Sequence, residues 1–330
     1  MSKPKIAIVG AGITGLACAY VLASRYNVTI IARDLPGDLG LAWASPWAGA
    51  VFHPQNTTNP LLRKMQEDSF RFYWDLAKRE DDCGVGVYHM TEFFENEEEV
   101  WYKDLMSGWC EGKRGVEGLK VREYETVCMN PEILLLWLRK RLEGTGVRFV
   151  RREVESLEHA KSIVGAQVVV NASGVGAREL AHDEAVRPVR GQTMFVKTDF
   201  AECVMLEGSE YTYVIPRKGS GGVIMGGVKS ERLDADIDVD LRSDILRRVN
   251  RLTGDAFGGL DVEKGLREGK VRDVLGFRPG RKGGVRVERV GGTVHAYGVE
   301  GAGYIYSFGV AVRVGELVEE VLKLGRKAKL

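Results

Sequence analysis

The stretch that most constrains this chain is residues 5–33, which read KIAIVGAGITGLACAYVLASRYNVTIIAR. Residues 6–9 form a short apolar, β-branched run that predicts a buried parallel strand rather than a helix. A glycine-rich turn follows, then apolar residues at helical spacing, then a second predicted strand over 28–31. A strand, a turn, a helix and a strand in this order predict an α/β fold with a dinucleotide site at the first turn.

The turn has the pattern G-x-G-x-x-G at Gly10, Gly12 and Gly15. The first glycine permits the tight turn, the second lets the backbone approach a pyrophosphate, and the third lets the helix lie close to the strand. The start of the helix adds free N–H groups and a partial positive charge. Asp34, just after Arg33, is the expected acidic partner of a ribose hydroxyl, one residue from the usual spacing. The motif alone does not distinguish NAD from FAD.

Length and charge narrow the class of protein. A chain of 330 residues is longer than a typical single domain, which favours two interleaved lobes with a shared cleft. A formal net charge of +1 predicts no bulk attraction to nucleic acid or to an anionic membrane. No apolar run approaches the roughly 20 residues of a membrane helix, so neither a membrane span nor a signal peptide is expected. Five scattered cysteines without a C-x-x-C pair predict packing residues, with no metal site and no disulfide framework.

Three further segments have the composition of ligand-binding structure. Residues 44–50, ASPWAGA, are too small to build a core, so they suit close backbone contact with a flat or phosphorylated ligand, with Trp47 as an apolar wall. A surface loop anchored by one Trp is the alternative. Residues 171–176, NASGVG, end a buried strand, at the edge where open α/β sheets bind ligands. Residues 301–303 begin the last helix, whose positive end is expected to point into the cleft.

The rest of the chain divides into a helical part and a strand-rich part. Asn130 is expected to cap a helix over 131–143, and further helices are predicted over 61–78 and 239–253. Strands are predicted over 148–150, 167–171, 193–197, 211–216, 223–225, 271–278, 285–290 and 294–297. The short strands after residue 187 predict a mostly antiparallel sheet beside the dinucleotide lobe.

Taken together, these segments resemble a known family, the FAD-dependent D-amino-acid oxidases, which include the D-aspartate oxidases, and in particular their fungal members. The matching motifs are VGAGITGL at 9–16, ARDLP at 32–36, SPWAGA at 45–50, NASGVGA at 171–177, RPVRGQ at 187–192, YVIPR at 213–217, GFRP at 276–279 and HAYGVEGAGY at 295–304. Eight motifs in the family's order cover nearly the whole chain. The ARDLP match also accounts for the position of Asp34.

The resemblance implies a Rossmann-type FAD-binding lobe interleaved with a mostly antiparallel β-sheet substrate lobe. The FAD-binding lobe is expected over 1–50, 130–185 and 276–330, and the substrate-binding lobe over 51–129 and 186–275. The family's reaction transfers the α-hydride of a D-amino acid to the flavin, and the imino acid then hydrolyses to a 2-oxo acid and ammonia. Dioxygen reoxidises the flavin and leaves as hydrogen peroxide. The substrate partners implied are therefore a small D-amino acid and dioxygen.

The final residues Ala328, Lys329 and Leu330 resemble the S-K-L address of peroxisomal proteins. This resemblance predicts a peroxisomal import receptor as a partner and the peroxisomal matrix as the location. The alternative is a frayed basic terminus after a helix. A peroxide-producing enzyme has a reason to carry such an address.

The resemblance also carries site residues. Arg278 is expected to take the substrate α-carboxylate as a bidentate fork, and Tyr213 to add a hydrogen bond to the same group, as the two catalytic residues. The FAD contacts implied are Gly10, Ala11, Gly12, Ile13, Thr14, Gly15, Arg33, Asp34, Ala44, Ser45, Trp47, Ala48, Gly49, Val154, Ala172, Ser173, Gly174, Arg278, Gly301, Ala302, Gly303, Tyr304 and Ile305. Ile305 departs from the glutamine of yeast-type members. The loop over 206–210 is too short for the active-site lid of some relatives, so Tyr211 is not assumed to replace the lid tyrosine.

The expected substrate contacts are His53, Gln55, Tyr213, Arg217, Arg278 and Gly301. Gln55 replaces an aromatic residue of several relatives that prefer neutral substrates, and a polar donor suits a second carboxylate better than an apolar chain. Arg217 discriminates little, because neutral-substrate relatives also have arginine there. These residues favour acidic D-amino acids such as D-aspartate slightly over neutral ones. A glycine or sarcosine oxidase, an NAD-linked dehydrogenase and a non-catalytic dinucleotide sensor are the other readings, and the assembly state stays open.

Overall fold

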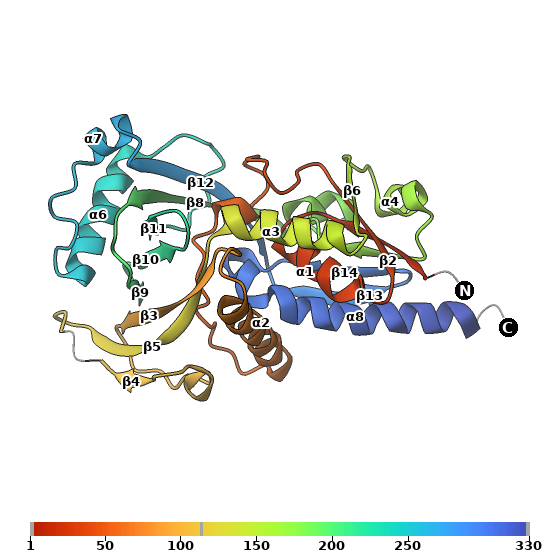
Figure 1. Cartoon of the computed structure of the whole chain (residues 1–330), viewed down its shortest axis with the longest axis horizontal. Coiled ribbons are helices and arrows are strands. Elements are labelled where there is room, and N and C mark those ends of the chain that lie inside the picture. The colour runs from red at the N-terminus through yellow and green to blue at the C-terminus, as the bar shows by residue number, and fades with distance from the viewer. Residues whose placement is uncertain (1–2, 113–114, 328–330) are drawn as a thin grey trace.

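The computed structural model describes residues 3–112 and 115–327, and shows two β-sheets side by side along the long axis of the molecule (Figure 1). One sheet carries the first glycine-rich turn, and the other is formed largely by the strand-rich part of the chain. The predicted peroxisomal address at 328–330 lies outside the described residues.

The first sheet has six strands in the order β13-β14-β7-β1-β2-β6. Its strands are β1 (Lys5–Val9), β2 (Asn27–Ala32), β6 (Arg148–Arg151), β7 (Val168–Asn171), β13 (Arg286–Val290) and β14 (Thr293–Tyr297). All its pairs are parallel except β13 with β14. In the register, Val9 lies between Ile31 and Asn171. The carboxyl ends of β1, β2 and β7 therefore meet at one edge of the sheet.

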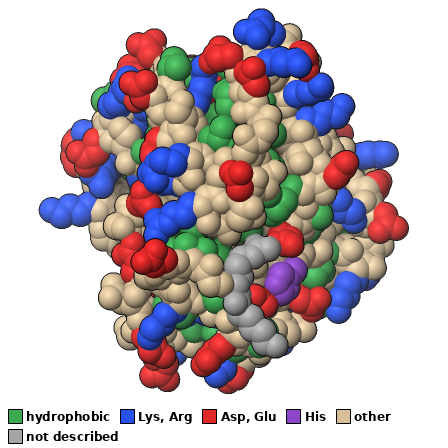
Figure 2. Space-filling model, turned by 90° about the vertical axis from the view of Figure 1, so that its left-hand side faces the viewer, with side chains coloured by type: hydrophobic (Ala, Val, Ile, Leu, Met, Phe, Trp, Pro, Cys, Tyr) green, Lys and Arg blue, Asp and Glu red, His purple; other side chains and the backbone are tan. Residues whose placement is uncertain are grey.

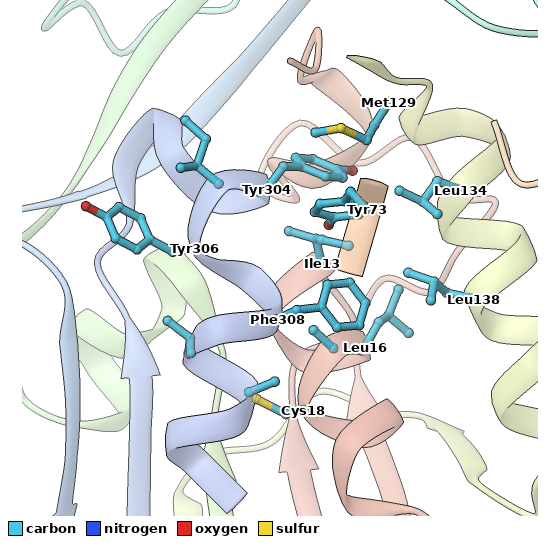
Figure 3. Packing of buried hydrophobic residues seen from close by; sticks show 14 of the residues in the cluster. Ile13, Leu16, Cys18, Tyr73, Met129, Leu134, Leu138, Tyr304, Tyr306 and Phe308 are labelled. Atoms are coloured by element: carbon cyan, nitrogen blue, oxygen red, sulfur yellow. The ribbon is translucent and has the colours of Figure 1, made fainter. Parts of the chain in front are cut away.

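Helices cover this sheet, and the last helix of the chain packs against the first two. The helices are α1 (Ile13–Leu22), α2 (Pro60–Arg79), α3 (Pro131–Gly144), α4 (Leu157–Val164), α5 (Ala177–Leu180) and α8 (Gly303–Lys327). In Figure 3, Phe308 of α8 lies beside Leu16 of α1 and Tyr73 of α2. The rings of Phe308 and Tyr73 meet edge to face, with centroids 5.3 Å apart. A Cβ at Gly309 would lie 2.0 Å from the Met65 carbonyl oxygen, so only glycine lets α8 approach α2 this closely. This packing fixes the start of α8 next to the start of α1.

The second sheet has eight strands in the order β12-β8-β11-β10-β9-β3-β5-β4. Its strands are β3 (Val85–Phe94), β4 (Cys110–Glu111), β5 (Lys120–Met129), β8 (Val186–Lys197), β9 (Cys203–Glu207), β10 (Thr212–Arg217), β11 (Gly222–Gly226) and β12 (Val271–Arg281). Every pair is antiparallel except β3 with β9. Helices α6 (Val239–Thr253) and α7 (Val262–Arg267) pack on it. The mixed α/β class with a mostly antiparallel second sheet is therefore confirmed.

The structure differs from the sequence predictions in several places. Strands β3, β4, β5 and β9 were not predicted. Strands β13 and β14 belong to the first sheet and not to the antiparallel sheet that the short strands after residue 187 predict, and they lie within 276–330, the segment expected in the FAD-binding lobe. The expected lobe boundary at residue 276 falls inside β12, because the pairing of β12 with β8 continues through Arg281. Asn130 occupies the N-cap of α3, but its side chain donates to the Lys218 carbonyl at 3.0 Å and to the Ser220 hydroxyl instead of capping the helix.

Charges of both signs are mixed on the face of the molecule that the second sheet forms. Figure 2, which faces the end of the molecule formed by the second sheet, shows basic and acidic side chains interspersed. Of the five cysteines, Cys18, Cys83, Cys128 and Cys203 are buried, as expected for packing residues, whereas Cys110 is exposed. Within residues 3–112 and 115–327, no helix is both long and apolar enough to cross a membrane.

Candidate active site

One large cavity of about 1370 Å³ lies between the two sheets. Its walls come from the carboxyl ends of β1, β2 and β7, the loop over 42–51, the inner strands of the second sheet, and the start of α8. The cavity therefore joins the glycine-rich turn to the segments that the sequence predicts for substrate binding.

Glycine is required at each of the three positions of the turn for a different structural reason. Gly10 has φ +106°, and a Cβ there would lie 2.4 Å from the Ala172 carbonyl oxygen. A Cβ at Gly15 would lie 2.0 Å from the Gly10 carbonyl oxygen, so Gly15 seats the helix on the turn and does not line the cavity. A Cβ at Gly12 would lie 2.9 Å from the Ser45 hydroxyl oxygen. Backbone is thus exposed to the cavity where a diphosphate needs it.

The loop over 42–51 brings polar groups to the same turn. The Ser45 hydroxyl accepts the Ile13 N–H at 2.9 Å, at the start of α1. Trp43 is buried and lines the cavity, and its buried indole N–H has no hydrogen-bond partner among the described residues. Since an indole N–H can only donate and buried donors are normally paired, this site fits a ligand oxygen such as that of a phosphate or ribose. The residues present therefore fit FAD. The sequence reasoning missed Trp43, although its place in a loop of small residues was a usable signal.

Most of the predicted FAD contacts do line this cavity. They are Gly10, Ala11, Gly12, Ile13, Thr14, Arg33, Asp34, Ala44, Ser45, Trp47, Ala48, Gly49, Val154, Ala172, Ser173, Gly174, Arg278, Gly301, Gly303, Tyr304 and Ile305. Gly15 and Ala302 do not line it, because Gly15 packs against the Gly10 carbonyl and Ala302 is buried in the core. At the outer end, the Arg33 Nε donates to the Asp34 carboxylate at 2.8 Å.

Arg278 and Tyr213 meet on the wall of the second sheet. The Arg278 Nη1 donates to the Val228 carbonyl at 3.0 Å and to the Arg190 carbonyl at 3.3 Å, which orients the guanidinium. A Cβ built at Gly191 would lie 2.5 Å from the Arg278 Nη1, so the guanidinium fits there only because residue 191 is glycine. Burial raises the pKa of the Tyr213 hydroxyl, while the positive charge of Arg278 and its hydrogen bond oppose the shift. A cation and a neutral hydroxyl thus face the cavity together.

Two cavity residues near this pair were not predicted. The ring of Tyr211 lies 5.3 Å from the ring of Tyr213, centroid to centroid, and lines the cavity. Lys229 also lines it, 5.6 Å from the Tyr211 ring centroid, and its Nζ lies 3.5 Å from the Glu300 carboxylate. The spacing of Tyr211 and Tyr213, two residues apart along a strand, would have placed both on one face.

His53 and Gln55 enter the cavity from the segment after the 42–51 loop. The Gln55 side chain is exposed, while its backbone is held by the Gln66 amide and by the indole of Trp101. His53 is buried, with its Nε2 3.0 Å from a carboxylate oxygen of Glu92. The two side chains therefore lie together at the cavity, one free to contact a ligand and one held by a buried anion.

Glu92 is the centre of a buried polar cluster behind His53. Its side chain is 1% exposed, and it accepts from Arg122 Nε at 2.9 Å and from the Tyr124 hydroxyl at 2.7 Å. Tyr102 adds a hydroxyl 3.4 Å away. Burial favours the neutral acid, but His53 and Arg122 outweigh it and hold the pKa of Glu92 well below its usual range. Burial likewise opposes the charge on His53, yet Glu92 raises its pKa overall.

Sheet register explains why this cluster reaches the site. Arg122 of β5 lies opposite Glu92 of β3, Glu92 opposite Met205 of β9, and Met205 opposite Tyr213 of β10. One row across the sheet therefore runs from the cluster to the Tyr213 ring. Sequence reasoning missed Glu92 because β3 was not predicted.

Arg217 is a correction to the predicted substrate contacts. Its Nε donates to the Gly49 carbonyl at 2.8 Å and its Nη2 to the Ala48 carbonyl at 2.7 Å, while its Nη1 lies 3.2 Å from Glu132. All three guanidinium nitrogens are engaged, and Arg217 does not line the cavity. Its role in the structure is to hold the 42–51 loop.

Comparisons with known proteins agree with this architecture. A family model described as "FAD dependent oxidoreductase" matches residues 5–317. The D-amino-acid oxidase of Schizosaccharomyces pombe is 31% identical over 94% of this chain and 95% of its own length. The D-amino-acid oxidase of Rubrobacter xylanophilus is 33% identical over 96% of each chain, and the D-aspartate oxidase of Talaromyces thermophilus 28% over 96% and 95%.

Solved structures show the same fold at lower identity. Glycine oxidase from Geobacillus kaustophilus superposes with a TM-score of 0.74 at 21% identity, over 97% of this chain and 95% of that one. Because the family model spans most of the chain and relatives above 30% identity cover nearly all of it, the chain belongs to the family of FAD-dependent oxidoreductases.

Proposed function

We propose that this protein is an FAD-dependent oxidase of D-amino acids. The observation that carries the proposal is the meeting of Arg278 and Tyr213 on the wall of the cavity that also holds the glycine-rich turn. The named activities of the relatives from Schizosaccharomyces pombe and Rubrobacter xylanophilus support the same reading. Oxygen uptake by a yellow, flavin-containing preparation on addition of a D-amino acid tests it, and a colourless preparation would exclude it.

Bound FAD would supply the chemistry, accepting the α-hydride of the amino acid and passing its electrons to dioxygen. The residues that would hold it are the turn at Gly10 and Gly12, the Ser45 loop, and the Trp43 indole N–H. The start of α8 at Gly303 brings the positive end of a helix to the same cavity, which favours negative charge on a ligand there.

The chain's own task is orientation. Arg278 has its Nη1 anchored on backbone carbonyls, so the rest of its fork is preset to receive the substrate α-carboxylate. Tyr213 adds its hydroxyl to the same carboxylate. A carboxylate held at two points, with the side chain directed to His53 and Gln55, presents the α-hydrogen of only one enantiomer toward the cofactor. No acid or base of the protein is needed at the reacting carbon in this arrangement.

The side-chain pocket favours acidic D-amino acids slightly. The carboxylate of Glu92 raises the pKa of His53, which favours its cationic form, and Gln55 provides an exposed amide at the same end of the cavity. Both groups suit a second carboxylate, which is costly to bury without partners. The D-aspartate oxidase of Talaromyces thermophilus shows that this activity occurs among the relatives.

Substitution Gln55→Leu is expected to impair D-aspartate oxidation more than D-alanine oxidation, by about threefold to tenfold in kcat/KM, since one hydrogen bond to a charged group is lost. Oxygen uptake with D-aspartate, D-alanine, L-alanine and glycine measures this. Asn56→Leu, one residue further along the same exposed segment, is the control. A wild-type preference for D-alanine would remove the acidic assignment, and turnover of glycine would favour a glycine oxidase.

We further propose that Ala328, Lys329 and Leu330 direct the protein to the peroxisomal matrix through an import receptor. The support is their resemblance to S-K-L together with a proposed product, hydrogen peroxide, that the peroxisome handles. A fluorescent protein ending in residues 321–330 is expected to collect in peroxisomes, and the same fusion with Leu330→Ala is expected to stay diffuse. Equal distribution of the two fusions would count against the address.

A further inference from the structure

Glu207 lies at the substrate end of the cavity without a role in the function proposed above. It is the last residue of β9, two positions after Met205, and both residues line the cavity. Its side chain is 68% exposed, and its carboxylate oxygen lies 3.7 Å from His53 Nδ1. Within the described part of the chain, His53 is the one ionic partner of the Glu207 carboxylate.

His53 is thus placed between two carboxylates of opposite character. Glu92, on β3, is buried and bound by Arg122 and Tyr124, so it has no freedom to leave. Glu207, on β9, is exposed, and among the residues that the structure describes its carboxylate forms no other ion pair. The other groups that face His53 are Arg122, whose charge opposes that of the imidazolium, and the ring of Tyr102. Only the contact with Glu207 can be exchanged for another anion.

We propose that Glu207 is a displaceable counter-ion of His53 that determines the charge preference of the side-chain pocket. The inference rests on the proposed function, in which the substrate side chain points to His53. With a neutral side chain in the pocket, Glu207 keeps its contact with the imidazolium. A substrate carboxylate must displace Glu207 and tolerate its negative charge nearby, so Glu207 lowers the preference for acidic substrates that His53 creates.

An alternative role for Glu207 is direct binding of a cationic side chain. The 3.7 Å contact with His53 argues against it, because the carboxylate already has a cationic partner held in place from behind by Glu92. A lysine-like substrate would have to approach His53 and Arg122 closely, at a like-charge cost. Removing the charge of Glu207 separates the two roles: it would improve binding of acidic substrates if Glu207 is a counter-ion of His53, and would impair binding of cationic substrates if Glu207 binds them.

The test is Glu207→Gln in the FAD-loaded enzyme. The ratio of KM for D-alanine to KM for D-aspartate is expected to rise about twofold to fivefold, the scale of an ion pair at an exposed position. The rise should shrink at 0.5 M salt compared with low salt, because exposed charges are screened. Glu98→Gln, an exposed glutamate outside the cavity, changes the net charge equally and is expected to leave the ratio as in the wild type.

Binding of non-oxidisable carboxylates separates this inference from the proposed function. By calorimetry, Glu207→Gln is expected to bind succinate more tightly relative to propionate than the wild type does, whether or not amino acids are turned over. An unchanged or lower succinate preference would overturn the role of Glu207. A selective loss of D-lysine oxidation in Glu207→Gln would overturn it in favour of cation binding. Absence of turnover with every D-amino acid would instead count against the proposed function alone.

Discussion

Arg278→Ala is expected to raise the KM for D-amino acids by about two to three orders of magnitude while the flavin remains bound. Loss of one partner of a desolvated, charge-assisted pair costs roughly 3 to 5 kcal/mol, and each 1.4 kcal/mol is a factor of ten. The flavin is expected to stay, because the turn at Gly10 and Gly12 belongs to the first sheet, whereas Arg278 lies on β12 of the second sheet. The Ser45 loop is held by Arg217, which the substitution leaves in place. Oxygen-uptake kinetics and flavin absorbance of the purified variant measure the two quantities separately.

Two further variants sharpen the interpretation of Arg278. Arg278→Lys keeps the charge but loses the planar fork, so its KM is expected between those of the wild type and the alanine variant. Arg289→Ala removes an exposed arginine of β13 outside the cavity and is expected to behave as the wild type. A wild-type KM in Arg278→Ala, at full flavin content, would show that another group anchors the carboxylate.

Glu92→Gln is expected to destabilise the protein by about 3 to 5 kcal/mol, because it leaves the guanidinium of Arg122 largely buried without its anion. For a chain of 330 residues this corresponds to a fall in Tm on the order of 5 °C. Thermal unfolding of the FAD-loaded protein at neutral pH measures it. Glu98→Gln, at an exposed position of the same segment, is the matched control and is expected to unfold with the wild type.

The contribution of Glu92 should also depend on pH with a definite sign. Its pKa in the folded protein lies below the ordinary glutamate value of about 4.3, so its stabilising effect is present above that value and is lost as the pH falls through the folded pKa. The Tm difference between wild type and Glu92→Gln is therefore expected to narrow below about pH 4. The contribution of His53 to folding stability depends on pH in the opposite way, because its pKa is raised in the folded protein. That contribution is fully present below about pH 6.5 and is lost as the pH rises through the folded pKa. Equal Tm values at neutral pH would contradict the role of Glu92.

Residues whose role is set by the local backbone conformation were predictable from the sequence. Gly10 must adopt φ +106° and Gly15 must lie against the Gly10 carbonyl, and both needs follow from a tight turn between a strand and a helix a few residues away. The same locality applies to the start of α8 after Gly301. Arg278 and Tyr213 were found differently, through family motifs, and the structure brings their side chains to one wall.

Other residues acquired their roles only through long-range packing. Arg217 follows Tyr213 in the same strand, yet its donors are taken by the Ala48 and Gly49 carbonyls, about 170 positions earlier in the chain. Glu92 is one carboxylate in an acidic stretch of sequence, and its burial depends on partners from β5 and from the segment of His53. Nothing near either residue indicates these partners.

The sequence by itself thus determined where the dinucleotide turn lies, because the φ angles and close contacts of its glycines are set by neighbours a few residues away. The tertiary structure alone decided which charges face the substrate end. The charge of a buried side chain depends on the ions and dipoles around it, and around His53 these come from β3, β5 and β9, strands that meet only when the sheet forms.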